Sequence, residues 1–400
     1  MILFDKYFNQ SMKKLADNFL NKLKKGKLDV TYPYPNHDKK IFVGEKSGYS
    51  ADIILHNYKL FSKLLRKGST GFAESYMDGD FDTSNLSNLL LFGFDNESDF
   101  LKNKKDNSII EFYVKFRHYL NQNTKNKSQR NIKYHYDLGN DFYKHWLDKT
   151  MTYSSAIFSE KNCNLYDAQM HKYDQIAKPM QLNENSTLLE IGCGWGGFST
   201  YVAKKYKTQV KAITISKAQF DFASKRIFKE GLNEKVFIEM KDYRDISKTY
   251  SNIASIEMFE AVGKKYWSTF LEIIKKTLVS DGLASLQIIT INDEKALAYQ
   301  DKPDFIQQYI FPGGVLPSKK QLMDLSRDLE LSLTEEKNFK HSYAHTLQLW
   351  NQKFQKAWPD IASQQGFSLR FKKMWEYYLT YCEVGFITGA TDVSHFVLKK

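Results

Sequence analysis

The chain has 400 residues, of which 42% are hydrophobic, so it is long enough for a sizeable core and predicts two domains, or one domain with a large extension. Three cysteines are too few for a disulfide framework, and no run approaches the roughly 20 apolar residues that cross a bilayer, which favours a soluble protein of the reducing cytoplasm. A net charge of +12 indicates attraction to a polyanion, either nucleic acid or anionic phospholipid.

Residues 1–25 have the pattern of a basic amphipathic helix. Apolar side chains recur at three- and four-residue steps, and lysines crowd the remaining positions. The apolar positions are Phe8, Met12, Leu15, Phe19 and Leu23. Two interpretations remain open: a helix that packs on its own domain, and a helix that lies on a membrane surface.

A small mixed domain is predicted over residues 28–120, where short strand-like and helix-like runs are separated by glycines. The expected strands are Lys40–Val43 and Ala51–Leu55, and the expected helices are Tyr58–Lys67 and Leu86–Leu91. Residues 122–131 are entirely polar and basic, which is typical of a linker. The predicted division is therefore a domain at 1–121, a linker at 122–133 and a domain at 134–400.

From Ser186 onward, short apolar strands alternate with amphipathic helices. The strand-like runs are Leu188–Ile191, Val210–Ile215, Val236–Met240, Ile253–Met258 and Leu283–Ile289. Such alternation predicts an α/β fold in which a parallel sheet carries helices on both faces.

The strongest local signal follows the first of these strands. The strand runs directly into a turn with Gly192, Gly194 and Gly196, after which a helix begins near Phe198. Glycines there permit a tight turn and let a ligand approach the backbone. As a dinucleotide fingerprint the loop is imperfect, because its spacing is Gly-x-Gly-x-Gly-Gly and no acidic residue ends the next strand.

Polar side chains at the ends of three strands favour a different ligand. Glu190 ends the first strand and suits a ligand with a cationic amino-acid portion, such as S-adenosylmethionine. Gln219, after the second strand, is placed to bond ribose hydroxyls, and Asp242 with Tyr243, after the third, to hold adenine. The ends of parallel strands are where ligands bind in such sheets.

Together these motifs resemble the cyclopropane-fatty-acyl-phospholipid synthase family, which includes the mycolic acid cyclopropane synthases and related fatty-acid methyltransferases. The matching motifs are Tyr134–Phe142, Met151–Ser154, Glu190–Gly197, Asp242–Asp245, Glu257–Glu260 and Tyr309–Gly314. Residues 28–100, with Ala73–Gly79, look like the lipid-handling N-terminal domain of that family. The resemblance implies a Rossmann-like class I methyltransferase domain that binds S-adenosylmethionine. The cofactor-binding positions it implies are Tyr136, Tyr153, Ser154, Glu190, Gly192, Gly194, Gly196, Thr214, Ser216, Gln219, Asp242 and Tyr243.

Members of this family use a bound bicarbonate ion as the base. The resemblance implies that Glu260, Tyr343 and backbone donors at Ser155 and Ile289 bind it here. Ser155 stands where a cysteine is usual, but its backbone N–H can still donate. Gln287 stands where a histidine is common, which removes a titratable group and leaves an amide donor.

Cys382 matches a cysteine that has been regarded as an active-site residue in the family. Because buried cysteines are commonly inert, a catalytic role and a packing role both stay open for it. No metal site is expected, since neither the cysteines nor the histidines have metal-ligand spacing.

The resemblance implies transfer of a methylene unit from S-adenosylmethionine to the double bond of an unsaturated phospholipid acyl chain, which forms a cyclopropane ring. A methyl- or methylene-branched product is the alternative. A methyltransferase of soluble small molecules and a non-catalytic binder of membrane or nucleic acid are two further possibilities. We expect an enzyme that is peripheral at the inner, anionic membrane surface and binds no nucleic acid; a homodimer is open.

Overall fold

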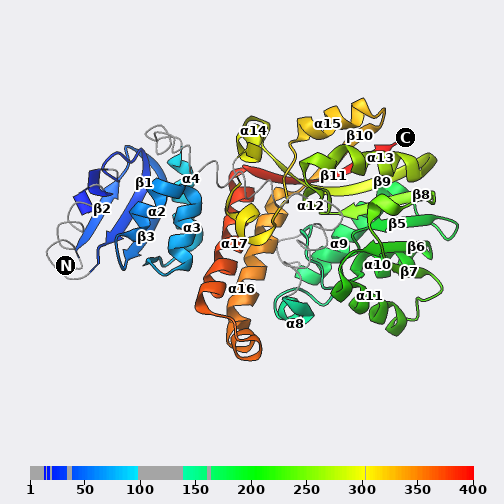
Figure 1. Ribbon diagram of the computed structural model, residues 1–400, viewed down its shortest axis with the longest axis horizontal. Coiled ribbons are helices and arrows are strands. Elements are labelled where there is room, and N and C mark those ends of the chain that lie inside the picture. The colour runs from blue at the N-terminus through cyan, green and yellow to red at the C-terminus, as the bar shows by residue number, and fades with distance from the viewer. Residues whose placement is uncertain are drawn as a thin grey trace. The chain divides into compact units, whose positions relative to one another are not determined.

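The computed structural model describes residues 13–14, 16–18, 20–33, 38–97, 138–159, 164–301 and 303–400. The chain folds as two compact units (Figure 1). The first comprises Met1–Val114 and Trp358–Val384, and the second Lys115–Ala357 and Gly385–Lys400. The predicted linker at 122–133 lies outside the described residues. None of the described helices is long and apolar enough to cross a membrane.

The first unit is built on a four-stranded sheet of order β2-β1-β3-β4, in which β1 and β3 are parallel. Its elements are β1 (Lys25–Thr31), β2 (Lys39–Val43), β3 (Lys46–Leu55), α2 (Lys59–Lys67), α3 (Ser69–Met77), β4 (Phe81–Asp82) and α4 (Leu86–Asp95). The four predicted elements are confirmed, and β1, α3 and β4 are additions. Along β1, alternate residues such as Leu28 and Val30 are buried, as expected of a strand with one face on the core.

Much of the predicted N-terminal amphipathic helix lies outside the described residues. In the described part, Ala16, Leu20 and Leu23 are buried. Lys40 forms an ion pair with Asp17 at 3.0 Å. These contacts favour, for this part, the interpretation in which the helix packs on its own unit.

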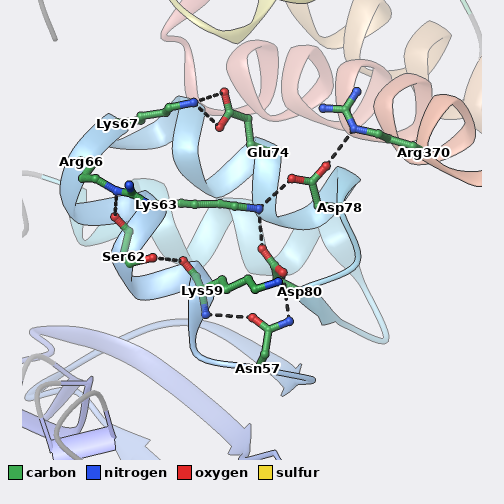
Figure 2. A network of polar contacts seen from close by, with 10 residues as sticks. All are labelled: Asn57, Lys59, Ser62, Lys63, Arg66, Lys67, Glu74, Asp78, Asp80 and Arg370. Carbon is green, nitrogen blue, oxygen red and sulfur yellow. Dashed lines mark hydrogen bonds and ion pairs between the residues drawn. The ribbon is translucent and has the colours of Figure 1, made fainter. Parts of the chain in front are cut away.

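Residues 358–384 belong to the first unit, although the sequence predicted them within the domain at 134–400. Polar contacts join this segment to helices of the first unit. Figure 2 shows Lys63 donating to Asp78 and Asp80, at 2.7 and 2.6 Å. Arg370, on α17 (Leu369–Thr388), donates to the other oxygen of Asp78 at 2.8 Å. These bonds join α17 to α2 and α3, and such contacts between distant segments leave no pattern in the local sequence.

The second unit contains a seven-stranded sheet of order β10-β11-β9-β8-β5-β6-β7. Its strands are β5 (Thr187–Ile191), β6 (Gln209–Thr214), β7 (Val236–Met240), β8 (Tyr250–Ile256), β9 (Leu278–Ile291), β10 (Ser332–Asn338) and β11 (Thr391–Lys399). The five predicted strands are confirmed and pair in parallel. The sheet is nevertheless mixed, because β11 pairs antiparallel with both β9 and β10.

Helices cover both faces of this sheet, which confirms the predicted α/β class. The helices described over residues 139–365 are α8 (Gly139–Lys144), α9 (Leu165–Ala177), α10 (Gly197–Tyr206), α11 (Lys217–Lys229), α12 (Phe259–Val262), α13 (Trp267–Thr277), α14 (Asp293–Asp301), α15 (Lys319–Asp328) and α16 (Lys340–Gln365), with 3-10 helices at Lys178–Met180, Tyr243–Asp245 and Lys264–Tyr266 and a π-helix at Ile306–Ile310. Leu188 packs into one apolar cluster with α9, α10 and α11, whereas Leu189 packs into another with α12, α13 and α15. Neighbouring strand residues point to opposite faces, so the two clusters are the two faces of the sheet.

The ion pairs of Lys63 generate a stability prediction. Lys63→Met removes the cation while Asp80, whose side chain is only 5% exposed, keeps its charge. The free energy of unfolding should fall by about 1 to 3 kcal/mol, because an uncompensated, largely buried carboxylate is costly. Lys24→Met is the control, since Lys24 pairs with Glu45 at an exposed surface and its loss should leave the urea midpoint unchanged. Equal midpoints for Lys63→Met and the wild type would contradict the prediction.

Candidate active site

The glycine-rich loop after β5 combines close packing with one open position. Gly192, Gly194 and Gly196 all have positive φ, at 82°, 52° and 79°. A Cβ on Gly192 would meet Met258 Cγ at 2.8 Å, and one on Gly196 would meet the Cβ of Ala223 at 3.1 Å. A Cβ on Gly194 would meet no atom within 4 Å. The first and third glycines therefore let the loop pack, and the second faces a space that suits a ligand lying against the backbone.

Glu190, at the end of β5, is 2% exposed and accepts a hydrogen bond from the Ser199 hydroxyl. Burial raises the pKa of Glu190 to about 7. Lys172 is fully buried and donates to the Ser154 hydroxyl at 2.7 Å. Burial lowers the pKa of Lys172 to about 8, against the opposing effect of Glu257, Asp148 and Glu190. This cation and these carboxylates thus share one weakly hydrated region.

The residues expected to hold the ribose form a connected group after β6. Thr214 donates to Gln219 Oε1 at 2.9 Å and accepts from the Ser216 backbone N–H at 3.1 Å. Ser216 is also the N-cap of α11, where it accepts from the Gln219 backbone N–H. These bonds fix the side chain of Gln219 and leave its amide Nε2 as the group that can donate to a ligand.

Asp242 and Tyr243 are engaged within the protein. Both oxygens of Asp242 accept hydrogen bonds from the Arg244 guanidinium, at 2.8 and 2.6 Å. The ring of Tyr243 is 6% exposed and packs edge-on against Phe270. The two adenine contacts expected of Asp242 and Tyr243 therefore remain predictions, and Arg244 is a neighbour that the sequence did not single out.

Tyr153 belongs to a group of packed aromatic rings, which we call the aromatic cluster. Its members are Tyr143, Trp146, Tyr153, Trp195, Phe311 and Trp350. Ring centroids of Tyr153 and Trp350 lie 5.4 Å apart. Tyr136, which the sequence also assigned to the cofactor, lies outside the described residues.

Glu260 lies on α12, just beyond the end of β8, and is 8% exposed. The Ile289 backbone N–H donates to its Oε1, and Oε2 has no hydrogen-bond partner within the described ranges. Burial, with the charge of Glu257 adding to it, raises the pKa of Glu260 to about 8. Near neutral pH this carboxyl therefore retains a proton.

Glu257 is a carboxylate at this site that the sequence reasoning did not single out. Its Oε1 accepts from the Ser155 backbone N–H at 2.9 Å and from Gln287 Nε2 at 2.6 Å, and its Oε2 accepts from Tyr343 Oη at 2.6 Å. We call these three donors the carboxylate cradle. The available signal was the position of Glu257 directly after a strand, in the same short motif as Glu260.

Gln287 is itself held in place from β11. His395 Nε2 donates to Gln287 Oε1 at 3.0 Å, and the two residues are direct partners in the β9–β11 ladder. Burial lowers the pKa of His395 to about 3, so the ring is neutral. Since the amide oxygen faces His395, the amide NH₂ faces Glu257. The sequence named Gln287 but not the histidine that orients it.

The residues present do not fit a free bicarbonate ion at the predicted position. Ser155 N–H and Tyr343 already donate to Glu257, and Ile289 N–H already donates to Glu260. The groups expected to bind an anion do donate hydrogen bonds, but carboxylates of the chain itself accept from them. The Ser155 hydroxyl donates instead to the Ala156 carbonyl. Cys382 is a partly buried thiol on the part of α17 that belongs to the first unit, and its catalytic role stays a prediction.

Comparison with known proteins shows the family of the chain. The profile of the family described as mycolic acid cyclopropane synthetase matches residues 123–396. The chain belongs to this family. It is 36% identical to the cyclopropane-fatty-acyl-phospholipid synthase of Escherichia coli K12, over 84% of each chain. It is 32% identical to the tuberculostearic acid methyltransferase UfaA1 of Mycobacterium tuberculosis, over 85% of this chain and 81% of the relative.

Among solved structures, the cyclopropane synthase MmaA2 of M. tuberculosis has a TM-score of 0.64 and 29% identity, and covers 68% of this chain and 98% of its own. Mycolic acid cyclopropane synthase CmaA1, solved with S-adenosylhomocysteine and CTAB, gives the same values. Coclaurine N-methyltransferase, at 18% identity and a TM-score of 0.62, shares the fold. The chain is therefore an S-adenosylmethionine-dependent methyltransferase of the cyclopropane synthetase family.

The open position at Gly194 predicts where the cofactor meets the backbone. Gly194→Ala should weaken S-adenosylmethionine binding about tenfold or more, because the added methyl would occupy the ligand's space. Gly231→Ala is the matched control: Gly231 also has a positive φ, at 66°, with nothing within 4 Å of its Cβ, but it lies between α11 and β7. Isothermal calorimetry with both variants separates backbone strain from lost space. Equal affinities for the two variants would show that the loop is misassigned.

The raised pKa of Glu260 predicts a pH dependence. In the folded state Glu260 holds its proton up to about pH 8, whereas the usual pKa of a glutamate is 4.5. The raised pKa therefore contributes its full stability below pH 4.5, and this contribution is lost as the pH rises through 8. The Glu260→Gln side chain cannot ionise, so the variant lacks this loss. The Tm of the variant minus the Tm of the wild type should therefore increase between about pH 6 and about pH 9. Glu330→Gln is the control, because Lys275 lowers the pKa of Glu330, which stays ionised across that window. A difference that is constant with pH for Glu260→Gln would refute the prediction.

Proposed function

We propose that this enzyme transfers a one-carbon unit from S-adenosylmethionine to the double bond of an unsaturated phospholipid acyl chain. The observation that carries the proposal is a carboxylate site next to an open glycine loop. Glu257 follows β8 and the loop follows the neighbouring β5, and the backbone of Gly192 approaches the side chain of Met258. A group held on the loop would lie near a residue able to accept a proton.

S-adenosylmethionine supplies an electrophilic methyl group: the alkene's π electrons form a new C–C bond as the C–S bond breaks, which leaves a cation on the acyl chain. The protein must then exclude water from that cation and remove a proton. The aromatic cluster offers ring faces that attract positive charge and apolar surface for the acyl chain. Glu190, Thr214 and Gln219 are the residues that we propose orient the cofactor.

The product depends on where the cation lies and which carbon loses the proton. Loss from the new methyl group, with the cation on the neighbouring chain carbon, closes a cyclopropane ring. Loss from a chain carbon leaves a methyl-branched alkene, and loss from the methyl group after a 1,2-hydride shift to the cationic carbon leaves a methylene branch. We propose the ring first, because the chain is 36% identical to a cyclopropane-fatty-acyl-phospholipid synthase and 32% identical to a tuberculostearic acid methyltransferase. The branched product is the second candidate, and the second relative is what favours it.

We also propose that the enzyme works as a peripheral protein at the inner, anionic membrane surface. Support comes from the net charge of +12 and from the first unit. There Ile41 and Val43 on β2 are 58% and 72% exposed, and Lys39 and Lys40 precede them on the same strand. Exposed apolar side chains beside lysines suit contact with anionic lipid. A homodimer remains a prediction from the resemblance.

The test of this function is the fate of a defined lipid. With S-adenosylmethionine and vesicles of an unsaturated phosphatidylglycerol, the acyl chains should gain the mass of one CH₂ group, because one carbon is added and one proton lost. Vesicles of a saturated phosphatidylglycerol are the control and should remain unchanged. Treatment with ozone then distinguishes the products, because ozone cleaves a remaining double bond and leaves a cyclopropane ring intact. Conversion of neither lipid, with cofactor binding intact, would refute the proposal.

A further inference from the structure

The carboxylate cradle collects donors from three segments around one side chain. Ser155 lies in the segment before α9, Gln287 on β9 and Tyr343 on α16, and all three donate to Glu257. A bicarbonate ion and a glutamate side chain present the same planar, anionic O–C–O group, so one set of donors serves either. We propose that the Glu257 carboxylate is the base of this reaction and accepts the proton lost by the alkylated acyl chain, so that turnover requires no dissolved anion. This inference rests on the proposed function.

The backbone of Glu257 supports a functional role independently of the hydrogen bonds. Its φ is 49°, in the left-handed region, which L side chains rarely adopt. Such conformations persist where the surroundings fix them, and they cluster at active sites. Glu330 is another glutamate with positive φ, at 54°, but its side chain is exposed and pairs with Lys275. At Glu257, by contrast, the strained backbone accompanies a carboxylate seated in the cradle.

Glu257 is better placed than Glu260 to exchange a proton with a substrate. Glu257 is only partly buried, whereas Glu260 is 8% exposed and accepts from the Ile289 backbone N–H. Burial raises the pKa of both, and the charge of Glu257 further raises that of Glu260. Both oxygens of Glu257 accept hydrogen bonds, whereas Oε2 of Glu260 has no partner among the described residues, so the donors present favour the negative charge on Glu257. Lys172 favours this charge on Glu257.

The cradle also determines which oxygen takes the proton. Oε1 accepts from two N–H groups that can only donate, so a proton on Oε1 would displace one of them. Oε2 faces the Tyr343 hydroxyl, which can donate or accept, and Tyr343 can therefore reverse its role when Oε2 is protonated. In ring closure, a C–H bond of the new methyl group breaks, its electron pair forms the second C–C bond to the cationic carbon, and the proton moves to Oε2. Release of this proton to water restores the carboxylate. Gln287, oriented by His395, is a positioning residue in this scheme.

The decisive experiment compares variants in buffer depleted of carbon dioxide, with unsaturated phosphatidylglycerol vesicles and S-adenosylmethionine. The wild type should be fully active, and added bicarbonate should not raise its rate. Glu257→Gln should lose about a hundredfold or more in turnover while binding S-adenosylmethionine normally, because an amide cannot take the proton. Glu257→Gly should be similarly slow, but bicarbonate or formate should restore part of its rate by entering the vacated cradle. The Glu257→Gly variant should also keep the native fold, since glycine adopts a positive φ without strain.

Glu330→Gly is the matched control, because it removes a glutamate with the same backbone conformation from an exposed site, and it should behave as the wild type. Wild-type product formation that stops on bicarbonate depletion, or a Glu257→Gln variant with undiminished turnover, would overturn the assignment of Glu257 alone. Absence of any altered acyl chain from the wild type would overturn the proposed function and the base together. The two failures are thus distinguishable in one set of measurements.

Discussion

A carboxylate that is partly withdrawn from water needs hydrogen-bond donors, and the arrangement of the second unit depends on how Glu257 obtains them. The loop before α9, strand β9 and helix α16 each direct one donor at this side chain. The donor from β9 is in turn oriented by β11 through Gln287 and His395. Because a misplaced donor would leave a partly buried charge unsatisfied, these four segments are constrained together.

The same region is balanced by a buried cation. Lys172 donates to Ser154, next to the residue whose backbone N–H holds Glu257, and its charge opposes the raised pKa of both Glu190 and Glu257. A single ammonium group thus influences both Glu190, at the end of β5, and the Glu257 carboxylate in the cradle. Buried charges without a partner of opposite charge are costly. The positive charge of Lys172 therefore explains how several acidic side chains can lie at an otherwise apolar sheet edge.

Two neighbouring parallel strands bring the glycine loop and the cradle to one place. β5 ends at the glycine turn and β8 ends at Glu257, and these strands are direct partners in the sheet. Only a glycine at 192 allows the close approach to Met258, because any Cβ there would lie 2.8 Å from that side chain. A local choice of residue in one loop therefore sets the distance between the two halves of the site.

The sequence by itself determined the parts whose information is local. Apolar runs of strand length identified five strands of the second sheet, and the glycine turn after β5 predicted where the cofactor binds, because periodicity and backbone freedom are properties of short segments. The family resemblance also implied Ser155, Gln287 and Tyr343 as donors. Only the tertiary structure decided what they bind, since the partners of Glu257 lie 102, 30 and 86 residues away. For the same reason the antiparallel β11, the place of α17 in the first unit and the pairing of Asp242 with Arg244 became clear only from side chains and strands brought together by folding.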